Sequence, residues 1–283
     1  MCWTSLFNFP EMRSAMSKTM IIHFNAPGHE FGADEIKSEG FLTFAQLAKQ
    51  IETVIEKKQY LDNLFICKFT EMYSLFFFFD KRVRSVIGFG MGAGSDVLSE
   101  FVVNNADRTS GLFLIGASCT KMSYMEWTFF YKELWTIHVY GICESVLSNA
   151  VSRMFAYATQ EKDKDLVEFY KTNLKRLNSK NVSKFVQAYM NKQDLSKRLE
   201  QNAKGKFPLL LCVGADSPCH DDTVHYNSVV RSRDFIAYFD KANLLTEECT
   251  PKVAECAYLF LLSCGLSLPH VIFKFDEHNR YDY

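Results

Sequence analysis

A short glycine-rich turn has the spacing of a site for nucleophilic attack. The apolar run Val83–Phe89 (VRSVIGF) predicts a buried strand, which leads through Gly90–Gly94 (GMGAG) into an amphipathic helix. A strand, a G-x-X-x-G turn and a helix form the nucleophile elbow of hydrolases. The outer glycines allow strand and helix to approach closely, and the central residue attacks the substrate carbonyl. The central residue here is Gly92, which has no side-chain atom that could attack.

The two other members of a catalytic triad also fail to appear where they are expected. The acid commonly follows a late strand in a Gly-x-x-Asp-Pro loop, and here Ser217 occupies the position of the acid, with Asp216 one residue early. The base should lie in the loop before the last helix, but residues 231–251 contain no histidine. A triad needs the base to contact the nucleophile and the acid to orient the base. The sequence therefore predicts a protein that is not an enzyme.

Other residues leave a second interpretation open. A residual esterase could use Ser95, beside the elbow, or Asp216. For Ser95 the alternative is a polar residue in the first turn of the helix. Labelling by a fluorophosphonate serine probe that is lost in Ser95→Ala would favour the esterase.

Further polar and aromatic residues favour structural roles. His23 and His29 flank a turn and are expected to be hydrogen-bonded loop residues. Trp127 and Trp135 are expected to be packing residues and not a ligand-binding box. A metal could be suggested by five residues that crowd together: Cys219, His220, Asp221, Asp222 and His225. Their spacing fits no structural zinc pattern, so we expect no metal.

The glycines of the turn also admit a dinucleotide-binding interpretation. Gly88, Gly90 and Gly92 approximate a GxG fingerprint, with Ala93 in the place of its last glycine. Such a site needs an acidic residue at the end of the next strand. The next strand ends in residues 116–118 (GAS), which contain no acid, so we expect no cofactor.

Composition and charge narrow the classes of protein. Of the 283 residues 48% are hydrophobic and 23% are charged, which allows a large core, and the net charge of -1 disfavours nucleic acid as a partner. The nine cysteines are scattered without a CxxC pair, which predicts a reduced, cytoplasmic location. The apolar stretches 75–79 and 256–273 are too short or too interrupted to cross a membrane.

The order of elements predicts an α/β fold with a mostly parallel sheet. The expected elements are a strand at 19–24, a helix at 43–58 capped by Thr43, a strand at 83–89, a helix, strands at 111–116 and 208–214, and a last helix from Thr250. Helical periodicity dominates the segment between the strands at 111–116 and 208–214. We therefore predict a core formed by residues 1–118 and 207–283 under an all-helical cap formed by residues 119–206.

The segment 59–81 fits none of these elements. It is apolar without helical or strand periodicity, and a helix-to-strand connection is usually about two to six residues long. We predict a loosely packed excursion that is not a strand of the core sheet. Deletion of residues 60–80 should then leave the fold intact and raise solubility.

Several stretches resemble the N-myc downstream-regulated (NDRG) family of non-catalytic α/β-hydrolase-fold proteins. They are CWTSLFNFPEM (2–12), HFNAPGHEFGA (23–33), GFGMGAGSDVLSEFVVNNADRTSGLFLIG (88–116), MSYMEWTFF (122–130), NVSKFVQAYMNKQDL (181–195), LLLCVGADSP (209–218) and HYNSVV (225–230). The resemblance implies a helical cap and no working triad. It also implies signalling roles in differentiation, stress response or trafficking through protein partners, or phosphoinositide lipid. Compared with the family, the N-terminal strands are expected to be missing and 59–81 to have no counterpart.

Overall fold

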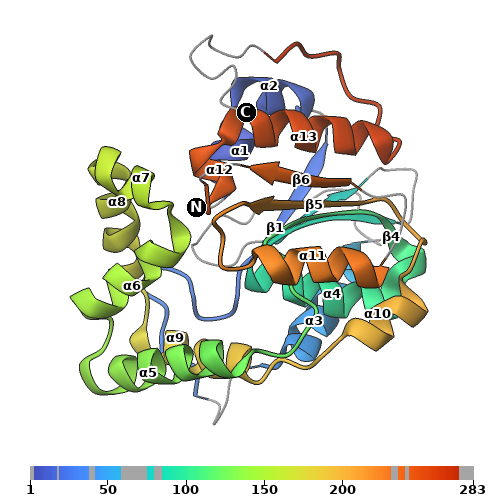
Figure 1. The fold of residues 1–283 in the computed structure, drawn as a ribbon. Helices are drawn as coiled ribbons and strands as arrows, with labels where there is room; N and C mark the ends of the chain where they lie inside the picture. Colours follow the sequence, from blue (N-terminus) through green and yellow to red (C-terminus); the bar gives the residue numbers. More distant parts are fainter. Residues whose placement is uncertain are drawn as a thin grey trace.

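A single six-stranded sheet organises the described part of the chain (Figure 1). The structure is a computed structural model that describes residues 3–17, 19–37, 42–58, 75–79, 85–230, 235–239 and 242–273. The strands are β1 (Met20–Phe24), β2 (Leu75–Phe79), β3 (Val86–Met91), β4 (Thr109–Ile115), β5 (Leu209–Gly214) and β6 (Phe235–Phe239), and they lie in that order. β3 to β6 run parallel, whereas β2 is antiparallel to both of its neighbours.

Helices cover both faces of the sheet, which is why β3, β4 and β5 are almost continuously apolar and buried. One face packs against α3 (Phe44–Lys58), α4 (Ala93–Asn105), α10 (Ser196–Asn202) and α11 (His220–Val230). The other packs against α1 (Thr4–Asn8), α2 (Pro10–Ala15), α12 (Leu245–Glu248) and α13 (Thr250–Ser263). Figure 1 shows these two layers below and above the sheet. This arrangement confirms the predicted α/β class.

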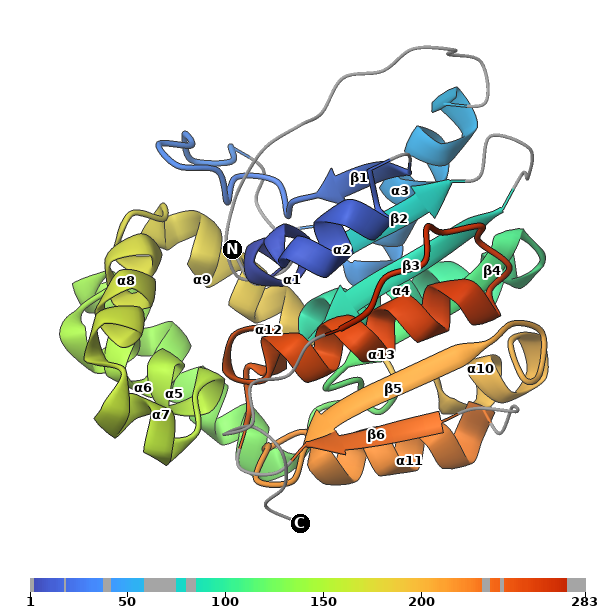
Figure 2. The ribbon, with the colours of Figure 1, turned by 90° about the horizontal axis from the view of Figure 1, so that it is seen from above.

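A group of helices lies at one end of the sheet, outside its two layers. It contains α5 (Tyr124–Tyr140), α6 (Glu144–Met154), α7 (Tyr157–Lys162), α8 (Lys164–Lys175) and α9 (Ser179–Met190), with a hydrophobic cluster of its own. Figure 2 shows this cap beside the sheet. The predicted cap range 119–206 also contains α10. Leu199 of α10 is instead buried in the cluster formed by α4 and α11, so α10 lies with the core helices.

Leu75–Phe79 forms a strand inside the sheet, so the predicted excursion is wrong for these residues. Phe77 of β2 pairs with Ile22 of β1 on one side and with Gly88 of β3 on the other. A strand with a neighbour on each side has its backbone groups hydrogen-bonded in both directions, which an exposed apolar loop cannot achieve. Deleting residues 60–80 would therefore remove a strand from between β1 and β3. The rest of the segment, 59–74 and 80–81, lies outside the described residues.

The loop after β1 is attached to the cap by a buried asparagine of α9. The side-chain amide of Asn181 donates to the carbonyl oxygens of Gly28 at 2.9 Å and Asp34 at 3.0 Å, and its oxygen accepts from the Ile36 amide at 2.9 Å. Next to it, Lys180 forms an ion pair with Glu35. These contacts fix α9 relative to the carboxyl end of β1 and so help to hold the cap over the sheet.

Candidate functional site

The predicted elbow is present, and its central position is bare. β3 ends at Met91, Gly92 has φ 55° and ψ −125°, and α4 begins at Ala93. A Cβ atom on Gly90 would lie 3.0 Å from the backbone of Gly94, which explains why position 90 is a glycine. A Cβ atom on Gly92 would meet nothing within 4 Å, so the position of a nucleophile opens into empty space.

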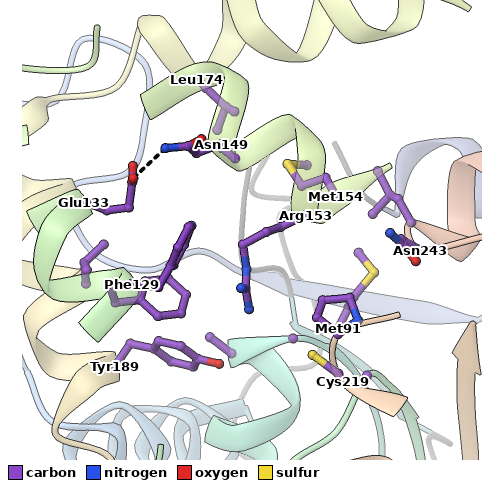
Figure 3. A pocket seen from close by; sticks show the side chains of 18 of the residues that line it. Met91, Phe129, Glu133, Asn149, Arg153, Met154, Leu174, Tyr189, Cys219 and Asn243 are labelled. Atoms are coloured by element: carbon purple, nitrogen blue, oxygen red, sulfur yellow. Dashed lines mark hydrogen bonds between the residues drawn. The ribbon is translucent and has the colours of Figure 1, made fainter. Parts of the chain in front are cut away.

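That space is a cavity of about 260 Å³, which we call the elbow cavity (Figure 3). Its floor is formed by the carboxyl ends of β3, β4 and β5, and its walls by the cap helices α5, α6 and α9. The lining is mostly apolar and includes Met91, Ile115, Phe129, Phe130, Ile137, Val146, Leu147, Met154, Leu174, Val182, Tyr189 and Val213. The site is thus shaped for an apolar ligand.

The remaining triad positions hold residues that cannot complete the chemistry. Ser217 lines the elbow cavity, and its hydroxyl accepts a hydrogen bond from the Cys219 amide at 3.3 Å. Asp216 is exposed and does not contribute to the lining. In the loop between β6 and α12, where a histidine base was sought, Asn243 lines the cavity. Its side-chain oxygen is buried and has no hydrogen-bond partner among the described residues.

Ser95 points away from the elbow cavity. It is fully buried in the first turn of α4, and its hydroxyl donates to the Ile115 carbonyl oxygen at 3.2 Å. It is absent from the cavity lining. A hydroxyl in this position cannot reach a molecule bound above Gly92.

Three polar side chains from the cap reach the elbow cavity, and the sequence analysis did not single them out. The Arg153 guanidinium lies 5.0 Å from the ring centre of Phe129, and one of its nitrogens is 3.6 Å from Glu126. The Asn149 amide donates to the Glu133 carboxylate at 2.6 Å. Asn149 and Arg153 are four residues apart on α6, so helical spacing was the available signal.

Cys219 also lines the cavity, but it is not a nucleophile at neutral pH. Burial raises the pKa of its thiol to about 11, even though Arg153 acts in the opposite direction. The neighbouring candidate ligands lie on α11, where the His220 ring contacts the Asp221 carboxylate at 3.0 Å. In the part of the chain that the structure describes, no three His, Cys, Asp or Glu side chains are grouped so that they could hold a metal ion.

The two candidate histidines near the start of the chain lie outside the elbow cavity, with His29 buried and His23 partly buried in β1. His29 packs edge-on against Phe185, with ring centres 5.2 Å apart, and its Nδ1 is 3.1 Å from the Pro27 carbonyl oxygen. Burial lowers the pKa of His29, and burial lowers the pKa of His23 to about 4. Both rings are therefore neutral at pH 7.

A buried ion pair joins the cap to the elbow helix. Lys192, which follows α9, contacts Asp96 of α4 at 2.9 Å, and both side chains are almost completely buried. Burial raises the pKa of Asp96 to about 6, although Lys192 opposes this. Burial alone would lower the pKa of Lys192, but Asp96 raises it above its usual value. The pair therefore fixes the position of the cap at a site that is sensitive to pH.

The tryptophans of α5 pack against neighbouring aromatic rings of the same helix but remain partly exposed. Trp127 is 41% and Trp135 56% exposed. Trp127 stacks on Tyr131 with ring centres 5.1 Å apart. Together with Tyr124 these residues recur at helical spacing on one side of α5, and we call them the α5 aromatic face. The apolar face that α5 buries is formed by other residues, such as Ile137.

A family model and several curated relatives match most of the chain. The model of the Ndr family matches residues 1–67 and 74–268. The NDRG-like protein of Dictyostelium discoideum is 26% identical over 95% of this chain and 76% of its own length. Protein NDRG2 of Danio rerio is 26% identical over 93% of this chain and 64% of its own length. Protein NDRG1-A of Xenopus laevis is 28% identical over 80% of this chain and 51% of its own length. The chain thus spans between about half and three quarters of these relatives.

Only residues 68–73 fall between the two matched ranges, so the expectation that 59–81 has no counterpart is wrong for most of that segment. β2 lies within the second matched range. The unmatched stretch itself is outside the described residues.

Solved structures with a similar fold are hydrolases. MenH from S. aureus has a TM-score of 0.66 at 14% identity, covering 86% of this chain and 83% of its own. The enol-lactonase from Burkholderia xenovorans LB400 has a TM-score of 0.65 at 14% identity, covering 92% and 86%. At this level of identity the similarity confirms the predicted α/β-hydrolase fold and nothing about activity. Over the described residues, no helix combines the length and apolar character that a bilayer crossing requires.

Proposed function

The chain belongs to the Ndr family, and from this premise we propose that it is a non-enzymatic adaptor of the NDRG type. It would act in cytoplasmic signalling, in differentiation, stress response or trafficking. The observation that carries the proposal is Gly92: the elbow backbone is intact, but its centre has no attacking atom. The described cysteines are all free thiols, which supports a reducing compartment.

Loss of the nucleophile is accompanied by loss of its partners. Acyl transfer by a triad requires a base in contact with the nucleophile and an acid that orients the base. Asn243 and Ser217 lie at the corresponding edges of the cavity, and neither can take up a proton near neutral pH. Because two further groups are absent, restoring the nucleophile alone should not restore chemistry.

Gly92→Ser is therefore expected to leave the hydrolysis of p-nitrophenyl butyrate at the level of the wild-type protein. A serine in this backbone conformation costs about 1–3 kcal/mol of stability, so the melting temperature should fall while the fold persists. Initial rates with both proteins, measured beside a buffer blank, test the expectation. Turnover by Gly92→Ser well above that of the wild type would contradict the proposal.

Labelling of the wild-type protein by a serine-reactive probe tests the alternative of a residual esterase that uses Ser95. A fluorophosphonate probe should leave the wild type unlabelled, because Ser95 is buried and bonded to a backbone carbonyl. Labelling that disappears in Ser95→Ala would establish an enzyme and overturn the adaptor proposal.

The α5 aromatic face is the surface on which we propose that a protein partner docks. Tryptophan and tyrosine are enriched at protein interfaces because they bury large areas with few rotatable bonds. α5 contains one lysine, Lys132, no arginine and two glutamates. A helix without a basic cluster is a poor ligand for an anionic membrane, which favours a protein over a phosphoinositide surface.

Replacing Trp127 and Trp135 together by serine should reduce capture of the partner at least tenfold without changing the melting temperature. Both side chains are exposed, so their loss removes little packing within the protein. Tyr157→Ser on α7 removes an aromatic residue that is even more exposed but lies on another helix, and it serves as the matched control. Proteins cross-linked to the wild type and to both variants would be quantified by mass spectrometry.

The expected result is a defined set of proteins that the wild type and Tyr157→Ser retain and the double variant loses. Vesicles of phosphatidylcholine with phosphatidylinositol phosphate should not bind the wild type. Vesicle binding that the double variant loses would assign the face to membranes, and equal protein capture by all three proteins would remove the face from the proposal.

A further inference from the structure

We infer that the elbow cavity binds an unbranched aliphatic carboxylate, with the carboxylate on Arg153 and the chain against the apolar walls of the cap. This goes beyond the proposed adaptor role and does not depend on it. The cavity lies between the edge of the sheet and the cap helices, and its volume of about 260 Å³ lies near the lower end for ligand pockets, roughly 300 Å³.

The position of the charged end follows from Arg153. Among the described residues that line the elbow cavity, Arg153 is the only cationic side chain, and Figure 3 shows it extending from α6 into the middle of the space. Its contact with Glu126, at 3.6 Å, is longer than a good hydrogen bond, so a guanidinium with five donors keeps donors for a ligand. A carboxylate is the partner that this planar group binds with two parallel hydrogen bonds.

Two features of the cavity decide the sign of the ligand charge. The rings of Phe129 and Phe130 could attract a cation, but the Arg153 guanidinium already lies 5.0 and 5.1 Å from their centres and would repel one. The single carboxylate of the lining, Glu133, is bonded to Asn149 on another part of the wall. It disfavours an anion there and so directs the ligand carboxylate towards Arg153.

The floor of the elbow cavity supplies further polar groups that could bind an anion. Asn243 has a buried side-chain oxygen without a hydrogen-bond partner in the described part, and rotation of the amide would present its NH₂ group to an anion. The N-terminus of α4 begins at Ala93, which also lines the cavity, and the dipole of this helix favours negative charge. Gly92 adds no side chain, so the floor remains open where an enzyme would hold its nucleophile.

The volume limits the length of the chain. At roughly 30 Å³ for each water-sized group in a liquid, the cavity holds about eight or nine such groups. Octanoate has this size, and it has matched ligands of opposite and zero charge in octylammonium and 1-octanol.

The test is calorimetric titration of the whole protein with these three molecules. Octanoate should bind with a stoichiometry of one, and octylammonium at least tenfold more weakly. In Arg153→Gln the affinity for octanoate should fall at least tenfold, while that for 1-octanol should stay within threefold, which shows that the cavity is intact. Arg176→Gln is the matched control, because this guanidinium also lies over a ring, Phe31, but outside the cavity.

A second variant tests the walls. Val146→Trp places a large side chain in the apolar part of the elbow cavity and should abolish binding of octanoate and 1-octanol together. The inference is overturned if the wild type does not bind octanoate, if octylammonium binds as well as octanoate, or if folded Arg153→Gln binds octanoate like the wild type. Because the comparison of octanoate with octylammonium uses the wild type, the test stands even if a variant fails to fold.

Discussion

Lys192→Met is expected to lower the free energy of unfolding at pH 7 by about 3–5 kcal/mol, because it leaves the buried Asp96 carboxylate without its counter-ion. The methionine side chain has a similar length, so loss of packing contributes little. Lys192 donates a hydrogen bond to one oxygen of Asp96 at 2.9 Å, and the substitution removes this bond together with the positive charge. Urea unfolding followed by circular dichroism would measure the change.

The effect of this substitution should depend on pH with a defined sign. The pKa of Asp96 in the folded wild type, about 6, is above its usual value of 3.8, so the folded state binds the proton more tightly. Stability from this group is therefore highest below about pH 4 and falls as pH rises to about 6, by roughly 1.4 kcal/mol per pH unit. Lys192 lowers the pKa of Asp96, so its removal extends that loss above pH 6.

The difference between variant and wild type should thus be largest at pH 7–8 and shrink towards pH 4. Lys192 also lowers the pKa of Asp222, which burial raises, so its removal shifts Asp222 in the same direction as Asp96 and adds to the difference. Lys180→Met is the matched control, because its ion pair with Glu35 is exposed and solvent screens it, so its loss should change stability far less. The double variant Lys192→Met/Asp96→Leu should regain most of the stability. A loss no larger than that of Lys180→Met would contradict the prediction.

Much of the fold could be predicted because the parallel strands are buried on both faces. The runs that became β3, β4 and β5 are continuously apolar and end at glycines, and strands of that kind are found between two helical layers. The helix expected at 43–58 is observed as α3, and its cap is confirmed by the Gln46 amide, which donates to the Thr43 hydroxyl at 3.3 Å. At these places the local sequence was sufficient to predict the secondary structure.

β2 could not be predicted in the same way because its place depends on its neighbours. The run 75–79 (LFFFF) is as apolar as the buried strands β3, β4 and β5, but the expectation of a short connection from α3 to β3 excluded a strand between them. The chain instead inserts an antiparallel strand between β1 and β3. Sequence periodicity contains no information about which partner lies beside a strand.

In the candidate site, too, some residues could be predicted from the local sequence and others depend on tertiary packing. Gly92 and Ser217 both line the elbow cavity because each follows a strand, where position along the chain fixes position at the edge of the sheet. Arg153 and Asn243 come from α6 and from the loop after β6. They meet above Gly92 only when the cap packs against the core, so no spacing in the sequence relates them to the elbow.

Gly214→Ala is expected to destabilise the protein by about 4 kcal/mol or more, the largest effect of any substitution considered. Gly214 ends β5, and a Cβ atom there would lie 1.5 Å from the carbonyl oxygen of Ala242 and 2.7 Å from its carbon. These are backbone atoms, so no rotamer change relieves the clash, and β5 must separate from the segment that follows β6. That segment is held in place by Glu248, which accepts hydrogen bonds from the Asn243 and Leu244 amides.

The matched control separates lack of space from backbone conformation. Gly205 has φ +69° with nothing within 4 Å of a Cβ atom, so Gly205→Ala is strained but does not clash and should cost about 1–2 kcal/mol. Soluble yield and melting temperature would be compared for both variants, with Gly214→Ala mostly insoluble or melting far below Gly205→Ala. If the two variants were equally stable, the chain between β6 and α12 would not lie against the end of β5. Asn243 would then have no fixed place at the elbow cavity.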